Sequence, residues 1–194
     1  MKPDWGDDLD VRYYVCEKLK QIKNKSVLDI GCGQGYLASF IDQSNNYFGV
    51  DTDQEDIKEA KKNNPNKNFE CKEFSFDAKR KFDVVLVANI IEVMNNRTEG
   101  LKDTICSTKT GGVIILTTPN GNNPYYRNKG KIKEEDLKNW LQGYNYKIYY
   151  WNPFPIQIHH LCKYFPIRDF FIGLFKYLMK FRFNSVSFYV EIYL

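Results

Sequence analysis

The sequence is poor in the features that define several large classes of protein. Its five cysteines are dispersed, with no C-x-x-C pair and no metal-ligand spacing, so we expect neither a disulfide framework nor a metal site. No apolar run reaches the roughly 20 residues of a membrane span, and no basic start followed by an apolar stretch indicates a signal peptide. We therefore expect a single cytoplasmic domain covering residues 1–194, large enough to bury a core without disulfides.

A strong excess of charge is also absent over most of the chain. Residues 1–150 hold 23 basic and 22 acidic side chains. They therefore offer no basic track for phosphates, and nucleic acid is not an expected partner. Residues 151–194 differ, because they hold 13 of the 31 aromatic residues and five basic against two acidic side chains. This last segment is expected to have a different neighbour or a different task.

The most informative segment is V-L-D-I-G-C-G-Q-G-Y at residues 27–36, which runs from apolar residues through an acid into three alternating glycines. The apolar period of residues 36–42 predicts a helix directly after the glycines. A strand that ends in a glycine turn and opens a helix is typical of a small-molecule site. The glycines permit a tight turn and close approach of the backbone to a ligand, and a helix start offers free N–H groups.

Asp29 and the glycine spacing indicate which ligand this turn binds. A carboxylate directly before the first glycine would repel a pyrophosphate, whereas it would attract the ammonium and sulfonium groups of S-adenosylmethionine. The spacing G-x-G-x-G also differs from the dinucleotide pattern G-x-G-x-x-G. A nicotinamide oxidoreductase is therefore disfavoured, and S-adenosylmethionine is the expected cofactor.

Apolar runs and helical periods alternate along the rest of the chain. Strands are predicted at residues 27–30, 47–50, 68–73, 82–88, 113–118, 146–151 and 187–193. Helices are predicted at residues 7–22, 36–42, 54–62, 98–107 and 134–142, and a turn at Gly111 and Gly112. Such alternation predicts an α/β fold with a parallel sheet and right-handed crossovers.

Asp51 is a second indication of the ligand. It closes the predicted strand 47–50, at the edge where parallel strands present their carboxyl ends to ligands. A carboxylate at that place can accept both ribose hydroxyls of an adenosine. The alternative is an ordinary turn aspartate in the run Asp51, Thr52, Asp53.

Five ordered motifs resemble those of the class I S-adenosylmethionine-dependent methyltransferases, in the branch with the ubiquinone-pathway enzymes and the type 11 and type 23 methyltransferase domains. They lie at residues 27–36, 47–52, 82–92, 111–120 and 133–146. The resemblance implies a single Rossmann-like domain whose seven-stranded, mostly parallel sheet has helices on both faces and an antiparallel last strand. It also implies methyl transfer from S-adenosylmethionine to a small-molecule or lipid-linked acceptor.

The resemblance implies cofactor contacts for a set of residues along the strand ends. Asp29 and the turn at Gly31, Cys32, Gly33 and Gly35 would hold the methionine portion. Asp51 would hold the ribose, with Thr52, Glu73 and Phe74 around the adenine and Asn89 beside the sulfonium. Two alternatives stay open, namely Glu73 as an ordinary exposed acid at a strand end and Asn89 as a structural turn residue.

No general base is apparent from the motifs. Related O-methyltransferases carry a histidine after the acid that corresponds to Glu92, but Val93 stands at that position here. His159 and His160, the only histidines, are the remaining candidates, and an incidental surface pair is the alternative. The run N-P-Y-Y at residues 123–126 is similar to a motif of nucleic-acid amino-methyltransferases. It lacks the second proline of that motif, and it follows the fifth predicted strand instead of the fourth. We interpret it as a turn.

An insertion at residues 152–185 separates the last two predicted strands, where the family has a short hairpin. Its apolar residues recur at a helical period, with basic residues elsewhere on the helix. Two interpretations stay open: a lid helix packed on the domain, and an interfacial helix at 167–182 that contacts an anionic membrane or covers a lipid-like acceptor.

Two alternatives to a small-molecule or lipid methyltransferase stay open for the function of the whole chain. They are a catalytically silent binding subunit and a nucleic-acid methyltransferase. The sequence predicts no oligomeric state.

Overall fold

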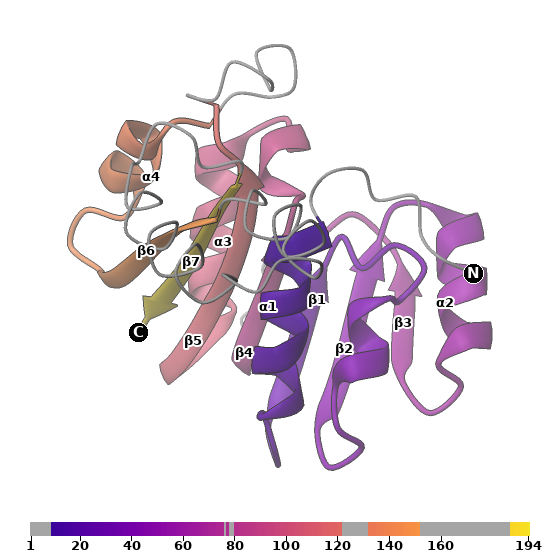
Figure 1. The fold of residues 1–194 in the computed structure, drawn as a ribbon. Helices are drawn as coiled ribbons and strands as arrows, with labels where there is room; N and C mark the ends of the chain where they lie inside the picture. The colour runs from indigo at the N-terminus through magenta and orange to yellow at the C-terminus, as the bar shows by residue number, and fades with distance from the viewer. Residues whose placement is uncertain (1–8, 76, 78–79, 122–131, 152–186) are drawn as a thin grey trace, which may run out of the picture.

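The computed structural model describes residues 9–75, 77, 80–121, 132–151 and 187–194, and it shows a central sheet with helices against it (Figure 1). The strands are β1 (Ser26–Ile30), β2 (Asn46–Asp51), β3 (Asn68–Cys71), β4 (Phe82–Ala88), β5 (Thr108–Pro119), β6 (Asn145–Trp151) and β7 (Ser187–Tyr193). The helices are α1 (Leu9–Lys20), α2 (Gln54–Asn63), α3 (Arg97–Cys106) and α4 (Glu134–Trp140), with two short 3₁₀ helices, η2 (Leu37–Phe40) and η3 (Ile91–Val93).

The seven strands are arranged in the order β3-β2-β1-β4-β5-β7-β6. All pairs from β3 to β5 are parallel, whereas β7 is antiparallel to both β5 and β6. The predicted Rossmann-like fold, with a mostly parallel sheet and an antiparallel last strand, is confirmed. The strand order reverses between β1 and β4, and a sheet of this kind binds ligands at the carboxyl ends beside that point.

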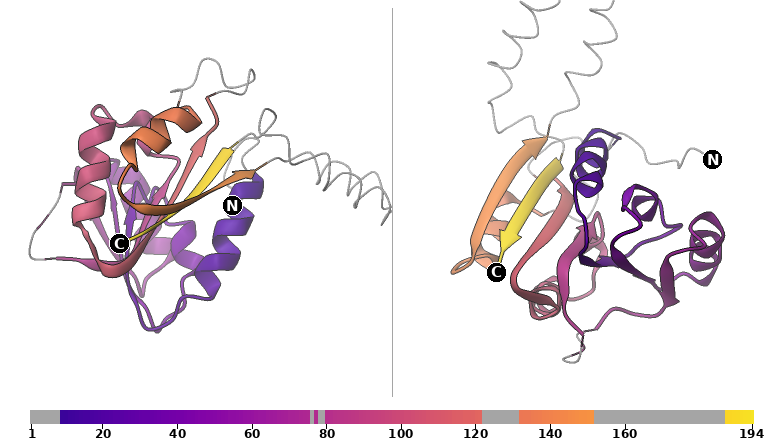
Figure 2. Two further views of the ribbon diagram at one scale, coloured as in Figure 1. Left: turned by 90° about the vertical axis from the view of Figure 1, so that its left-hand side faces the viewer. Right: turned by 90° about the horizontal axis from the view of Figure 1, so that it is seen from below.

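Alternating side chains give the sheet two apolar faces, and helices cover both of them (Figure 2, left). One face packs against α1, η2 and α2 through buried residues that include Leu19, Ala38 and Ile57. The other packs against η3, α3 and α4 through residues that include Leu101 and Leu137. We call these the α1 face and the α3 face. The prediction of helices on both faces is thus confirmed.

The helix predicted at residues 36–42 is shorter than expected. Only η2 forms there, as a 3₁₀ turn of four residues. No side chain caps its start at Tyr36, and the backbone becomes extended at Ile41, with ψ at 120°. Without a capped first turn, the segment lacks the stabilisation that a longer helix needs at its N-terminus.

The predicted turn at Gly111 and Gly112 lies inside β5 instead. Gly111 adopts a φ of +78°, and a Cβ on Gly112 would come within 2.9 Å of the backbone oxygen of Asp83 in β4. The register between β4 and β5 shifts next to this pair. The glycines therefore permit an irregularity within a continuous strand, as at a β-bulge, and do not end it.

The insertion at residues 152–185, with its predicted helix at 167–182 and its pair His159 and His160, lies outside the described residues. The same holds for the predicted turn at 123–126. Among the helices in the described ranges, none combines the length and the apolarity that crossing a lipid bilayer requires.

Candidate functional site

Three strand ends place the predicted site residues side by side. The glycine turn follows β1, Asp51 ends β2 and Asn89 follows β4. Because β1 lies between β2 and β4, these three ends are neighbours at the carboxyl edge of the sheet. The site is therefore assembled at the reversal of strand order.

The glycine turn has a backbone conformation that other residues rarely adopt, with φ at +70° for Gly31, +49° for Gly33 and +75° for Gly35. A Cβ at Gly31 would lie 2.7 Å from Cγ1 of Ile90, and one at Gly35 would lie 2.8 Å from Nδ2 of Asn64. The Asn64 amide also donates to the Gly35 carbonyl at 3.0 Å. The turn is therefore held from both sides, by Ile90 after β4 and by Asn64 after α2.

Four N–H groups of the turn donate within the protein. Two of them bond to the Val50 carbonyl at 2.8 and 3.1 Å, one bonds to Asp51 Oδ2 at 2.8 Å, and one bonds to a carbonyl of the turn itself at 3.0 Å. The donors are, in that order, Gly31, Cys32, Gly33 and Gly35. A phosphate-binding turn presents its N–H groups to the ligand. These four N–H groups are therefore already engaged, which disfavours a pyrophosphate at this turn.

Asp29 is buried on the α1 face, with 1% of its surface exposed. Its Oδ2 accepts the hydroxyl of Tyr47 at 2.7 Å, whereas its Oδ1 has no hydrogen-bond partner in the described part of the chain. Burial raises the pKa of Asp29 to about 7; the Tyr47 bond opposes this change and the charge of Asp51 adds to it. An unpaired buried carboxylate oxygen is costly, and a ligand cation would remove that cost.

Asp51 is oriented by two backbone groups. Its carboxylate accepts the N–H of Gly33 at 2.8 Å and the N–H of Asp53 at 3.0 Å. Asp53 is the residue that caps α2, because its side chain accepts the N–H groups of Glu55 and Asp56. The capping task thus falls to Asp53, while Asp51 borders the cavity at the end of β2.

A cavity of about 660 Å³ opens at this edge on the α3 face. Its apolar wall consists of Ile30, Val50, Phe74, Ile90 and Met94. Gly31, Asp51, Thr52 and Glu73 line its other side. The residues that were predicted to surround the ribose and the adenine are therefore brought to one cavity.

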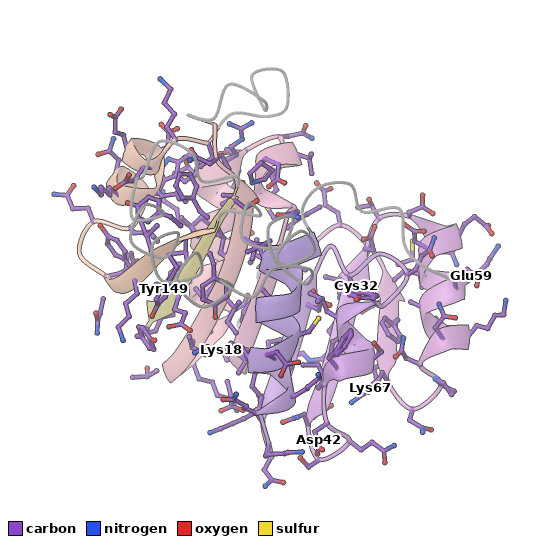
Figure 3. All side chains as sticks on the ribbon, in the orientation of Figure 1. Lys18, Cys32, Asp42, Glu59, Lys67 and Tyr149 are labelled. Carbon is purple, nitrogen blue, oxygen red and sulfur yellow. The ribbon has the colours of Figure 1, made fainter. Side chains whose placement is uncertain are left out.

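Cys32, in the glycine turn, is buried just beyond the end of β1 (Figure 3). Burial raises the pKa of its thiol, so the thiol stays neutral.

Asn89 and Val93 lie at the end of β4 and just beyond it. Asn89 has a φ of +54°, its N–H donates to the Thr117 carbonyl at 2.9 Å, and its Oδ1 accepts the Thr117 hydroxyl at 3.1 Å. These contacts join β4 to β5. Val93 is 67% exposed at the cavity and has no group that could take a proton. Within the described residues, no cluster of three or more metal-ligating side chains is present.

Comparisons with known proteins identify the family. The model of a family described as "Methyltransferase domain" matches residues 9–170, which is most of the chain. The chain belongs to the class I S-adenosylmethionine-dependent methyltransferases. The ubiquinone biosynthesis O-methyltransferase of Rickettsia bellii is 29% identical to it over 140 residues, which are 66% of this chain and 57% of that protein.

Solved structures share the fold of this chain. The plantazolicin methyltransferase BpumL, in complex with a pentazolic desmethylPZN analog and SAH, has a TM-score of 0.64 and 19% identity, covering 98% of this chain and 85% of that one. The [4+2]-cyclase SpnF has a TM-score of 0.61 and 16% identity, covering 96% and 80%. The chain spans between 28% and 57% of the length of the first curated relatives that it matches. Because one fold serves different reactions, the reaction must be argued from the site.

The site of this chain suits S-adenosylmethionine, the cofactor of its family. The unpaired oxygen of Asp29 can face a cation, and four amides of the turn beside it are already engaged within the protein. Asp51 stands where a ribose can be held, next to a cavity with an apolar wall for a base. The residues present therefore fit the group in charge, polarity and shape.

Sequence reasoning missed two residues that support Asp29. Tyr47 was assigned only to a strand, and Gly49 was given no role. A signal for Gly49 existed, because an isolated glycine inside an apolar strand indicates that another group approaches the backbone closely. No comparable signal existed for Tyr47, since its contact with Asp29 depends on the pairing of β1 with β2.

Proposed function

We propose that this protein transfers a methyl group from S-adenosylmethionine to a small-molecule or lipid-linked acceptor. The observation that supports this most is the unpaired Oδ1 of buried Asp29 beside a turn in which four amides are already engaged. Such a site favours a cation and disfavours a phosphate. S-adenosylmethionine, when bound, supplies a methyl group that its sulfonium has already activated. The protein must then mainly bind and orient the two reactants, which is the larger part of the rate gain in such transfers.

The described residues divide this task among them. Asp29 supplies the negative charge for the cationic end of the cofactor, and Asp51, fixed by two backbone N–H groups, accepts the ribose hydroxyls. Ile90 and Phe74 provide apolar surface that excludes water from the adenine side of the cavity. We propose no general base among the described residues, and His159 and His160 remain candidates from the sequence alone.

Calorimetric titration with S-adenosylmethionine tests the proposal. The wild-type protein should bind it, and Asp51→Asn, which keeps the shape but removes the charge, should bind about tenfold more weakly. Glu55→Gln, an exposed change at the start of α2, should bind like the wild type. Absence of binding by the wild type would reject the enzyme and favour a silent subunit. Binding of NADH in its place would favour an oxidoreductase.

The acceptor is proposed from the names of the relatives and from the sequence. A ubiquinone biosynthesis enzyme and a plantazolicin methyltransferase support a small organic acceptor. Mass spectrometry of molecules that co-purify with the protein, followed by transfer of a labelled methyl group to them, would identify it. Transfer to mixed RNA, with binding that weakens steeply as salt rises, would favour a nucleic-acid methyltransferase instead.

We further propose that residues 152–185 form part of the acceptor side of the same single domain. The helical period and the basic residues of 167–182 support either a lid or a contact with an anionic membrane. Sedimentation with anionic and with neutral liposomes separates these two possibilities. A membrane contact predicts that the wild type sediments with anionic vesicles and that Phe171→Asp/Phe175→Asp does not, whereas a lid predicts no difference between them.

A further inference from the structure

The side chain of Tyr47 contacts Asp29 diagonally between two neighbouring strands. The tyrosine is buried on the α1 face, and its hydroxyl donates to Asp29 Oδ2 at 2.7 Å. The two residues are not paired in the sheet, because Asp29 is opposite Gly49 and Tyr47 is opposite Val27. The ring therefore extends along β2, past Gly49, to the carboxylate. The bond joins β2 to β1 next to the glycine turn.

Gly49 leaves the space for this path. A Cβ at that position would lie 3.0 Å from the Tyr47 hydroxyl, 2.9 Å from Cys32 Sγ and 2.8 Å from the ring of Phe69. Phe69 packs against the Tyr47 ring, with the ring centroids 5.4 Å apart. The hydroxyl is thus confined by its neighbours to a position against Asp29.

Charged groups around Asp29 are few within the described residues. The described side chains packed on this face from β4, α1 and η2 include six that are uncharged at neutral pH, namely Leu86, Val15, Cys16, Leu19, Leu37 and Ala38. Asp51 is the carboxylate that acts on it from the end of β2, and the thiol of Cys32 stays neutral. Lys18 of α1 pairs with Glu191 of β7, at 3.4 Å. Tyr47 is therefore the group that stabilises the ionised form of Asp29.

We propose that Tyr47 is a positioning residue for the cofactor: it holds one oxygen of Asp29 and thereby presents the other, with its charge, to the cation of S-adenosylmethionine. This inference rests on the proposed function. Tyr47 itself need not touch the cofactor, since it acts through Asp29. Removal of its hydroxyl should therefore change how cofactor affinity depends on pH, in addition to the affinity itself.

The expected pH dependence follows from the state of Asp29. Only the ionised carboxylate attracts a cation, so the affinity of the wild type should rise with pH and level off only above pH 7, because burial has placed the pKa of Asp29 at about 7. The Tyr47 bond lowers that pKa. In Tyr47→Phe the pKa is higher, and affinity should still be rising at pH 7.5. The cofactor's own amino group loses its proton near pH 8, so pH 5.5 to 7.5 is the useful range.

Calorimetric titrations of the full chain with S-adenosylmethionine at pH 5.5, 6.5 and 7.5 test this. For a pKa change of one unit, Tyr47→Phe should bind about tenfold more weakly at pH 5.5 and about threefold more weakly at pH 7.5. Tyr189→Phe is the matched control, because Tyr189 is also fully buried on the α1 face but donates to Glu191, at 2.9 Å. It should bind like the wild type at each pH.

Two further variants keep the test decisive. In Asp29→Asn, adding Tyr47→Phe should have no further effect on affinity. If Tyr47→Phe folds poorly, Phe69→Leu, which loosens the packing on the Tyr47 ring, should shift the pH dependence in the same direction. A loss of affinity in Tyr47→Phe that is equal at all three pH values would overturn the inference alone. Absence of binding by the wild type would overturn the proposed function and this inference together.

Discussion

On the α1 face the proposed cofactor site consists of a buried carboxylate, the tyrosine that holds it and a turn with four engaged amides, whereas on the α3 face it consists of a cavity with an apolar wall. The first half has a charge that is costly until a cation meets it. The second half has apolar surface, which a flat ring can cover without any change of charge. We therefore propose that one cofactor is bound by two different physical effects, and these can be separated by pH and by the choice of ligand.

The largest effect is expected from Asp29→Asn, which should lower affinity for S-adenosylmethionine on the order of 100-fold, since one member of a buried charge pair is lost. The free energy of unfolding of Asp29→Asn should, by contrast, be higher than that of the wild type near neutral pH. The folded-state pKa of about 7 exceeds the usual 3.8, so the unfolded chain releases this proton first as the pH rises. The free energy of unfolding of the wild type therefore falls between about pH 4 and 7, in total by about 4 kcal/mol.

Asp29→Asn removes this pH-dependent cost but leaves an unpaired amide, so the net gain at pH 7.5 should be about 2 kcal/mol, measured by urea unfolding. At pH 4.5 the gain should vanish. Asp83→Asn is the control with the opposite sign: burial raises the pKa of Asp83, but hydrogen bonds from Ser26 and Lys109 outweigh it and hold the pKa at about 2. That variant should lose stability and keep its cofactor affinity. A destabilised Asp29→Asn at pH 7.5 would contradict the comparison.

Gly49→Ala should distort the part of the site on the α1 face without changing the charges there. The new methyl group would overlap Phe69, Cys32 and the Tyr47 hydroxyl, so we expect a loss of about 2 kcal/mol in stability and about tenfold in cofactor affinity through displacement of Tyr47. Gly111→Ala serves as the control, since its Cβ would meet nothing within 4 Å. It should lose about 1 kcal/mol from its positive φ alone and bind normally. Equal affinities of the two variants would argue against a role for Gly49.

Ile90→Ala tests the α3 half. Ile90 lines the cavity and abuts the turn at Gly31, so its truncation should weaken binding about fivefold, equally at pH 5.5 and 7.5, because only apolar contact is lost. Adenosine alone should show the same loss. Asp29→Asn, by contrast, should leave the affinity for adenosine unchanged. Val93→Ala, at an exposed lining residue, should change affinity less than twofold. A loss of affinity in Ile90→Ala that depends on pH would contradict the division of the site into a charged part and an apolar part.

The smallest effect is expected from Glu73→Gln, which decides between the two interpretations of Glu73. The residue is exposed but lines the cavity. If it accepts the adenine amino group, the affinity for adenosine should fall about threefold. An ordinary strand-end acid predicts no change. Glu70→Gln, in the neighbouring β3 and paired with Lys72 at 2.8 Å, is the control for a general loss of negative charge.

The fold could be predicted from the sequence because its strands are local signals. The run F-D-V-V-L-V-A at residues 82–88 is apolar nearly throughout, and only a parallel strand covered on both faces buries such a run. The glycine pair at Gly111 and Gly112 misled the prediction, because the same residues suit a turn and a strand irregularity. Which of the two forms depends on the pairing of β5 with β4, and local sequence does not encode it.

The residues of the candidate site could likewise be predicted where their signal is local in the sequence. Asp29, Asp51 and the glycine turn follow from spacing along the chain, so the structure brings them together as expected at three adjacent strand ends. The bond between Tyr47 and Asp29 could not be predicted, because it is a diagonal contact between strands whose relative register must first be known. The same holds for the packing of Ile90 against Gly31.

The position of β7 has a consequence for how the chain assembles during synthesis. The sheet order places β7 between β5 and β6, and β6 pairs with the sheet through β7. β6 leaves the ribosome first but has no place to dock until residues 152–186 and then 187–193 have followed. The pairing of β7 with β5, such as Pro119 with Ser187, spans a longer stretch of chain than the pairing of β1 with β4, such as Val27 with Val84, and contacts of greater sequence separation form more slowly. The β1–β5 part is therefore expected to form first, with β7 and β6 completing the sheet as one late step.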